Sequence, residues 1–267
     1  MTGKRNPLNQ FDARTESKRI SKFIKDYLKE SKARGVVLGI SGGIDSAVVA
    51  CLSKRALGNK VHGLLLFEDD AKGSVDYKHA KQVISLFKLK TREIPITRVV
   101  DSFVSSLKQS NFKPTRITLA NIKSRTRMIL LYAYANENKL LVLGTGDKSE
   151  EEIGYFTKYG DGGVDIQPIA HLYKTEVRAL ARALSIPSSI ISKPSSPNLW
   201  KNHKATDEIP VDYPTLDVIL SELYDRSRSP RDVAKKLHLS PKLVSEVVLR
   251  HNSSAHKRKY PPSIERL

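Results

Sequence analysis

The amino-acid sequence predicts an α/β protein in which a parallel sheet is flanked by helices and followed by a helical C-terminal extension. Short apolar runs rich in β-branched residues alternate with segments that are apolar at helical spacing. A turn with two glycines joins the first run to the helical segment behind it. Beyond residue 215 only helical periodicity remains. Strands that alternate with helices imply parallel βαβ units, with ligands at the carboxyl ends of the strands.

The first part of the chain carries the alternation. Residues 15–33 are apolar at helical spacing, through residues such as Ile20, Ile24 and Leu28. Residues 36–40 have the length and β-branched content of a buried strand, and residues 45–57 return to helical spacing. The same reasoning predicts strands at residues 61–67, 92–96 and 140–144 and helices at residues 75–87, 99–107 and 117–137.

The C-terminal part is predicted to consist of helices joined by irregular segments. Pro187 ends an amphipathic helix because proline cannot continue it. Residues 188–214, rich in Ser, Pro and Asn, are expected to form an ordered but irregular crossing. Helices are predicted at residues 174–184, at residues 216–224 and, as a pair of short helices broken at Ser240-Pro241, at residues 229–249.

Size and composition bound the class of protein. With 267 residues, of which 28% are charged and 39% hydrophobic, the chain is expected to form one globular domain over residues 1–267, with an N-terminal arm at 1–13 and a C-terminal tail at 253–267. No apolar run is long enough to span a bilayer, and no hydrophobic stretch follows the N-terminal charges, so we expect a cytoplasmic protein. The single cysteine, Cys51, excludes an internal disulfide.

The formal net charge of +18 is compatible with a nucleic-acid partner or with a polyanionic small substrate. Residues 229–249 look like a helix-turn-helix, which would favour DNA binding. Two short helices are also a common end to an α/β domain, and the second one carries Glu246 and few residues that read bases. Lys and Arg are spread along the chain with few aromatic neighbours. We therefore expect only weak, non-specific binding to nucleic acid.

The glycine-containing turn, Ser41-Gly42-Gly43-Ile44-Asp45-Ser46, lies between a strand and a helix. Such a turn presents free backbone N–H groups at a positive helix end, and both favour a phosphate anion. Ser41 and Ser46 can add hydroxyl donors, and Asp45 could hold a divalent cation against the same phosphates. The turn matches neither the P-loop nor the dinucleotide fingerprint. In an alternative interpretation it is an ordinary β–α turn whose serines and Asp45 cap the helix.

A second strand-to-loop junction, residues 145–165, is predicted to lie beside the first. It carries many carboxylates, hydroxyls and glycines. Residues 150–152 could simply be the solvated acidic start of a helix. That interpretation does not explain the aromatic and glycine-rich residues 159–163 that follow, which are typical of a loop that closes over a site.

Seven segments together identify a family. The turn alone resembles the pyrophosphate loop of enzymes that split ATP between its α- and β-phosphates. With the other segments, the chain resembles ammonia-dependent NAD synthetases over nearly its full length. The matching segments are residues 38–46, 121–128, 143–150, 154–162, 172–175, 206–208 and 256–258. The resemblance implies a Rossmann-like fold of the adenine nucleotide alpha hydrolase kind.

The reaction that the resemblance implies has two steps. The nicotinate carboxylate of deamido-NAD attacks the α-phosphate of ATP, which gives an acyl-adenylate and pyrophosphate. Ammonia then attacks the activated carbonyl, which gives NAD and AMP. Such chemistry needs neutralisation of phosphate charge and exclusion of water from the adenylate. A glutamine-dependent version would need a second domain with a nucleophilic cysteine, for which the sequence offers no plausible residue, so we expect free ammonia as the nitrogen donor.

The resemblance also implies roles for individual residues. Asp45 and Glu150 would hold Mg²⁺, and Lys174 would meet the ATP phosphates as a point charge. Asp161 would fold over the intermediate and help to deprotonate ammonium. The residues implied to bind ATP are Gly39, Ile40, Ser41, Gly42, Gly43, Ile44, Asp45, Ser46, Thr145, Lys174 and Ser196. The residues implied to bind deamido-NAD are Arg125, Lys158, Asp165, His256 and Lys257.

Each of these side chains has a plain alternative, and the chain departs from the family pattern in places. Lys174 could be a helix-start lysine on a solvated face, and His256 could belong to a disordered tail. Residues 195–200 and 206–213 differ from the usual crossing, and Asp147 stands where many relatives have Asn or His. The family is homodimeric, and the first helix offers apolar residues for such an interface, so we expect a homodimer.

One enzymatic rival shares the ATP-binding turn. An ATP pyrophosphatase-type tRNA-modifying enzyme would use the same loop to adenylate a tRNA base, and the high positive charge gives this alternative some appeal. Such an enzyme would want an RNA-binding domain or cysteine pairs, and the sequence has no such cysteines. A DNA-binding protein, the second rival, would leave residues 39–46 and 145–165 unexplained.

Overall fold

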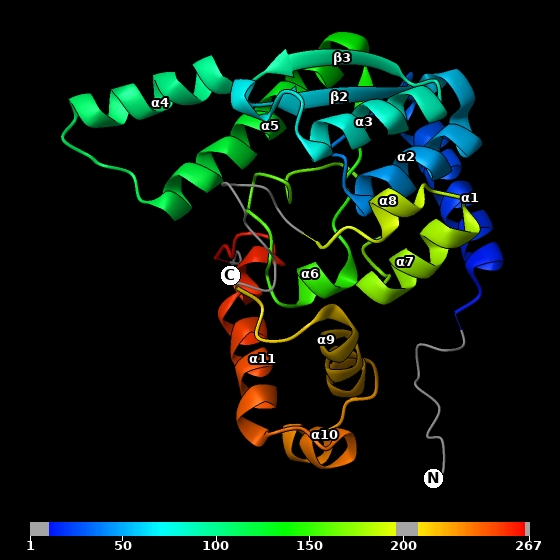
Figure 1. The fold of residues 1–267 in the computed structure, drawn as a ribbon, viewed down its shortest axis with the longest axis vertical. Coiled ribbons are helices and arrows are strands. Elements are labelled where there is room, and N and C mark those ends of the chain that lie inside the picture. The colour runs from blue at the N-terminus through cyan, green and yellow to red at the C-terminus, as the bar shows by residue number, and fades with distance from the viewer. Residues whose placement is uncertain (1–10, 196–207, 265–267) are drawn as a thin grey trace.

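A four-stranded parallel sheet forms the centre of the computed structural model, which describes residues 11–195 and 208–264 (Figure 1). The strand order is β3-β2-β1-β4. The predicted α/β, Rossmann-like sheet flanked by helices is therefore confirmed. The strands are β1 (Gly35–Gly39), β2 (Val61–Phe67), β3 (Lys90–Pro95) and β4 (Leu140–Val142).

Helices cover both faces of the sheet because side chains of β1 alternate between two buried clusters. Val36 and Leu38 pack with α1, α2, α3, α7 and α8, whereas Val37 packs with α4 and α5 on the other face. These helices are α1 (Ala13–Ser31), α2 (Ile44–Leu57), α3 (Val75–Leu86), α4 (Thr97–Gln109), α5 (Arg116–Asn138), α7 (Lys174–Ala183) and α8 (Ser188–Ile191).

The helical extension has a third buried cluster, which lies below the sheet in Figure 1. Its elements are α9 (Tyr213–Leu220), a π-helical turn (Ser221–Asp225), α10 (Pro230–Leu237) and α11 (Pro241–Ser253). Ser240 separates the last two helices and accepts a hydrogen bond from the Leu243 amide at 3.2 Å. Val233 of α10 and Val244 of α11 are both buried in the same cluster as residues of α9, so this helix pair packs onto the rest of the extension.

The predicted elements are present, and their boundaries differ in a few places. The strand predicted at 140–144 ends at Val142, because Leu143 then pairs with Ile166 in an isolated bridge. The irregular crossing predicted at 188–214 begins with the short helix α8. The helix predicted at 216–224 ends in a π-helical turn. None of the helices in the described residues is both long and apolar enough to cross a membrane.

Candidate functional site

The site lies where the strand order reverses. The chain moves from β1 to β2 and β3 on one side, whereas β4 pairs with the opposite edge of β1. Ligands of open α/β sheets bind beyond the carboxyl ends of the strands at such a switch point. The loop after β1, residues 40–43, and the loop after β4, residues 143–147, therefore lie next to each other, as predicted.

The loop after β1 is shaped by its glycines and serines. Gly42 has φ +80°, and a Cβ atom there would lie 2.1 Å from the backbone oxygen of Asp76. The Ser46 hydroxyl donates to the Gly43 oxygen at 3.0 Å and lies 3.0 Å from the Ser41 hydroxyl. Gly43 itself is the N-cap of α2 and has no side chain with which to cap it. The N-terminus of α2 thus keeps backbone N–H donors for an anion.

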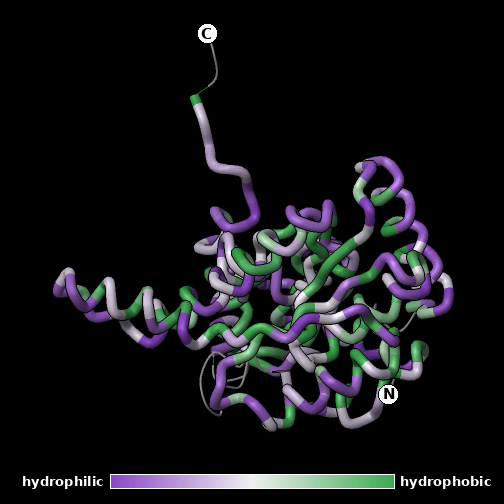
Figure 2. The backbone as a smooth tube through the Cα atoms, turned by 90° about the horizontal axis from the view of Figure 1, so that it is seen from above, coloured by the Kyte–Doolittle hydropathy of each residue, from purple (hydrophilic) through white to green (hydrophobic). Residues whose placement is uncertain are grey.

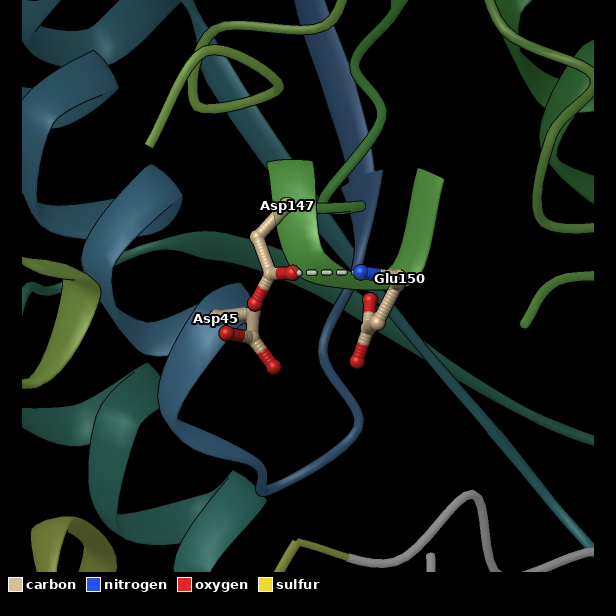
Figure 3. Close-up of side chains that lie close together, drawn as sticks. All are labelled: Asp45, Asp147 and Glu150. Carbon is tan, nitrogen blue, oxygen red and sulfur yellow. Dashed lines mark hydrogen bonds between the residues drawn. The ribbon is translucent and has the colours of Figure 1, made fainter. Parts of the chain in front are cut away.

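Three carboxylates lie close together beside this loop (Figure 3), and one lysine contacts all of them. Asp45 lies in the first turn of α2, and Asp147 is the N-cap of α6 (Lys148–Glu152), which carries Glu150. The Lys174 ammonium donates to Asp45 and Glu150 at 2.8 Å each and lies 2.7 Å from the Asp147 carboxylate. Lys174 and Asp147 are fully buried. We call these four residues the carboxylate–lysine cluster.

Burial and charge oppose each other in the carboxylate–lysine cluster. Burial raises the pKa of Asp147 and of Glu150, and the Lys174 ammonium counteracts that rise. Burial disfavours the charged form of Lys174, but the three carboxylates outweigh it and hold the pKa of this lysine well above its usual value. The Tyr213 ring, 5.2 Å from the Lys174 nitrogen, closes the cluster from α9.

The donor set fits a hard divalent cation. One oxygen from each of the three carboxylates lies within 4.8 Å of the others. Three carboxylates and one ammonium leave a net negative charge, and carboxylate oxygens are the ligands that Mg²⁺ prefers. The Oδ1 atom of Asp45 is buried and has no hydrogen-bond partner among the described residues, so it has capacity for a ligand.

The profile of the NAD synthase family matches residues 16–261. The chain belongs to the NAD synthase family. The NH(3)-dependent NAD(+) synthetase of Hyperthermus butylicus is 42% identical over 259 residues, covering 97% of this chain and 93% of the relative. An NMN synthetase from Francisella tularensis superposes with a TM-score of 0.84 at 31% identity, covering 96% of this chain and 99% of that one. An NH3-dependent NAD synthetase from Campylobacter jejuni superposes with a TM-score of 0.79 at 33% identity, covering 95% of this chain and 99% of that one.

One loop, residues 154–161, has most of the predicted deamido-NAD-binding residues around it. Lys257 donates to the backbone oxygens of Gly154 and Phe156 at 2.7 Å each, so its ammonium holds the start of the loop. Lys158 donates to the His256 oxygen at 2.7 Å. The C-terminal segment that carries His256 is thereby ordered against the loop.

Two further predicted residues have partners within the protein. The Arg125 guanidinium donates to the Lys158 oxygen at 3.2 Å. The Asp161 carboxylate accepts hydrogen bonds from the Ser124 hydroxyl at 2.8 Å and from the Thr157 amide at 2.9 Å. These contacts fix the glycine-rich loop against α5.

The last three predicted residues do not lie on that loop. They are Asp165, Thr145 and Ser196. Asp165 accepts from the Val142 amide at 2.7 Å and from the Tyr132 hydroxyl at 2.9 Å, which ties it to the end of β4. Thr145 is half-buried between β4 and α6. Ser196 lies outside the described residues.

Sequence reasoning left several residues of this region without a role. Asp147 enters only as a departure from the family pattern, although a carboxylate in the loop after β4 and three residues before Glu150 is itself a signal for a shared site. Arg127 lies in the matching segment 121–128, which gives it no role of its own. It is half-buried, donates to the Leu66 oxygen at 3.2 Å and lies 3.8 Å from the Glu68 carboxylate beyond β2. Burial lowers the pKa of Arg127, and the charge of Glu68 opposes this.

Proposed function

We propose that the chain is an ammonia-dependent NAD synthetase, which uses ATP to convert the carboxylate of deamido-NAD into the amide of NAD, with release of AMP and pyrophosphate. The observation that carries the proposal is the carboxylate–lysine cluster beside a phosphate-binding helix N-terminus at the switch point of the sheet. The chain's relatives from Hyperthermus butylicus and Campylobacter jejuni carry that name.

In the first step the chain has to bind and neutralise the ATP phosphates. The amides at the start of α2 and the hydroxyls of Ser41 and Ser46 would donate to phosphate oxygens. Asp45, Asp147 and Glu150 would hold Mg²⁺, which when bound supplies positive charge to those phosphates. Lys174 would add a fixed charge on the same side. Thr145 and Ser196 keep their proposed contacts with ATP.

In the second step the chain has to bring ammonia to the acyl-adenylate and keep water out. We assign Asp161 a place over the intermediate, where its carboxylate would take a proton from ammonium. Arg125, Lys158 and Lys257, with His256 and Asp165, would hold deamido-NAD. Lys257 holds the loop backbone, and Lys158 ties the loop to the C-terminal segment, so both residues would also set the position of the loop over the site.

The proposal is tested by product formation from the purified protein with ATP and Mg²⁺. One arm offers deamido-NAD with ammonium, and a second replaces ammonium with glutamine. A third offers nicotinate mononucleotide, because the neighbour from Francisella tularensis is an NMN synthetase. We expect NAD, AMP and pyrophosphate in the first arm only. NMN in the third arm without NAD in the first would overturn the choice of substrate.

Two rival functions lose support. Membership of the NAD synthase family argues against a tRNA-modifying ATP pyrophosphatase. The DNA-binding alternative is weakened because buried residues of α10 and α11 pack into the core of the extension. Nucleic-acid binding that survives physiological salt would contradict this assessment. Localisation in the cytoplasm stays a prediction from the sequence.

We further propose a homodimer, with the α4–α5 hairpin as its interface. This hairpin projects from the body as an arm with hydrophobic segments (Figures 1 and 2). Its exposed apolar side chains are Val99, Phe103, Phe112, Ile117 and Ile129. Several large apolar side chains exposed on one projecting hairpin favour an interaction site there.

A substitution pair distinguishes the hairpin from the first helix, which the sequence had suggested for the interface. Phe103 and Phe23 are exposed to a similar extent, 45% and 43%. We expect Phe103→Glu to give a monomer in analytical ultracentrifugation and Phe23→Glu to leave the dimer intact. The opposite result would place the interface on α1.

A further inference from the structure

A buried carboxylate of the helical extension contacts α6 and α7, two of the three helices that carry the carboxylate–lysine cluster. Asp217 lies in α9 and is fully buried. Its Oδ1 atom accepts a hydrogen bond from the Ser149 hydroxyl of α6 at 2.6 Å. Its Oδ2 atom accepts from the Thr175 amide of α7 at 2.8 Å. One side chain thus joins α9, α6 and α7.

These contacts cap α7 from other parts of the chain. The first amides of a helix have no partner within it, and the side chain of the N-cap residue usually satisfies one of them. In α7 the amide of the first residue, Lys174, donates to the Ser149 hydroxyl at 2.8 Å, and the next amide donates to Asp217. The start of α7 is therefore fixed by α6 and α9.

The residues that these contacts fix in place lie next to, or belong to, the carboxylate–lysine cluster. Ser149 directly precedes Glu150, and its hydroxyl bonds the backbone of Lys174, whose ammonium meets all three carboxylates. A shift of α6 against α7 would change the distances between that ammonium and its partners. Groups that hold ligating side chains in place typically affect metal affinity or activity about 10- to 100-fold.

We propose that Asp217, acting through Ser149, is a positioning residue that sets the geometry of the carboxylate–lysine cluster. The helical extension then takes part in the site at the sheet, because α9 supplies the carboxylate that aligns α6 with α7. The proposal rests on the proposed function for its activity measurement, whereas its metal-binding measurement is independent of the reaction.

The test compares Asp217→Asn and Ser149→Ala with Glu222→Gln. An asparagine at 217 can accept from Ser149 or from Thr175 but not from both. Glu222 is a matched control, because it is also a fully buried carboxylate of the extension but pairs with Arg228 and Lys236 at 2.8 and 2.6 Å, within the extension. Binding of Mn²⁺ to the protein alone is followed by electron paramagnetic resonance, and kcat and KM for ATP are measured alongside thermal unfolding.

We expect Mn²⁺ binding about 10- to 100-fold weaker in Asp217→Asn and in Ser149→Ala. Because both act through one network, the double variant should bind no more weakly than the worse single variant. Glu222→Gln should lower the melting temperature and leave Mn²⁺ affinity and KM for ATP unchanged. If Asp217→Asn does not fold, the Mn²⁺ affinity of Ser149→Ala alone tests the proposal.

The opposite pattern would overturn the proposal. Wild-type Mn²⁺ affinity in Asp217→Asn and Ser149→Ala, with only a lowered melting temperature, would reduce Asp217 to a packing role like that of Glu222. Weakened Mn²⁺ binding in a protein whose wild type forms no NAD would sustain the positioning role and refute the proposed function. The two failures are therefore distinguishable.

Discussion

Replacing Lys174 with methionine tests the charge balance of the carboxylate–lysine cluster. Methionine fills the volume of the lysine stem, so the main loss is the ammonium and its three ion pairs at 2.7 to 2.8 Å. Removing one partner from a buried ion pair costs about 3–5 kcal/mol. Because three carboxylates share this ammonium, we expect the free energy of unfolding to fall by an amount near the upper end of that range, about 5 kcal/mol.

The assay is thermal and urea unfolding in EDTA, followed by circular dichroism. A loss of that size corresponds to a fall of roughly 10–20 °C in melting temperature for a chain of this length. Lys148→Met is the control, because Lys148 is likewise the first residue of its helix but pairs with the single carboxylate of Asp225. Because that ion pair is partly exposed, we expect Lys148→Met to lower the free energy of unfolding by only about 1 kcal/mol.

Adding Mg²⁺ completes this test. A divalent cation on the three carboxylates would replace the missing positive charge, so millimolar Mg²⁺ should raise the melting temperature of Lys174→Met more than that of the wild type. If Lys174→Met were no less stable than Lys148→Met in EDTA, the carboxylates would be neutral in the folded chain. That result would contradict a cluster of ionised carboxylates that needs the Lys174 ammonium.

The remaining predictions concern the loop and the metal. Gly42→Ala should destabilise the chain more than Gly73→Ala and raise KM for ATP. Both positions have positive φ, but only at Gly42 would the new Cβ meet a neighbour, the Asp76 oxygen, at 2.1 Å. Equal urea midpoints for the two variants would contradict a tight approach at Gly42. Asp45→Asn and Glu150→Gln should each weaken Mn²⁺ binding by at least about tenfold and cripple NAD formation. EDTA should abolish NAD formation in the wild type and Mg²⁺ should restore it, and full activity in both variants would remove the metal assignment.

Local pattern predicted the sheet and the position of the site. The runs at β1 and β2 are apolar because both faces of these strands are buried, and the glycines after β1 mark a turn that only a residue without a side chain can make at Gly42. Pairing of β1 with β4 then brings Asp45 and Glu150 together. Parallel strands end at the same edge, so this neighbourhood follows from the fold class.

The finer arrangement depends on contacts between distant segments, which periodicity does not encode. Lys174 was predicted to meet phosphate, with a solvated helix start as the alternative, yet its side chain is fully buried among carboxylates from α2 and α6. Asp217 is 68 residues from its partner Ser149, so nothing in the local sequence of α9 announced the contact. The π-helical turn after α9 places Leu223 in the buried cluster of the extension, a contact between segments that periodicity does not encode either.

The path of oxygen during catalysis tests the proposed acyl-adenylate most directly. Deamido-NAD labelled with ¹⁸O in both carboxylate oxygens is incubated with the protein, ATP, Mg²⁺ and ammonium, and the products are analysed by mass spectrometry. Attack of the carboxylate on the α-phosphate forms a P–O bond that is kept when ammonia expels AMP, so we predict one ¹⁸O atom in AMP and one in the amide of NAD. Release of ADP with ¹⁸O in inorganic phosphate, or NAD formation with unlabelled AMP, would contradict adenylation at this site.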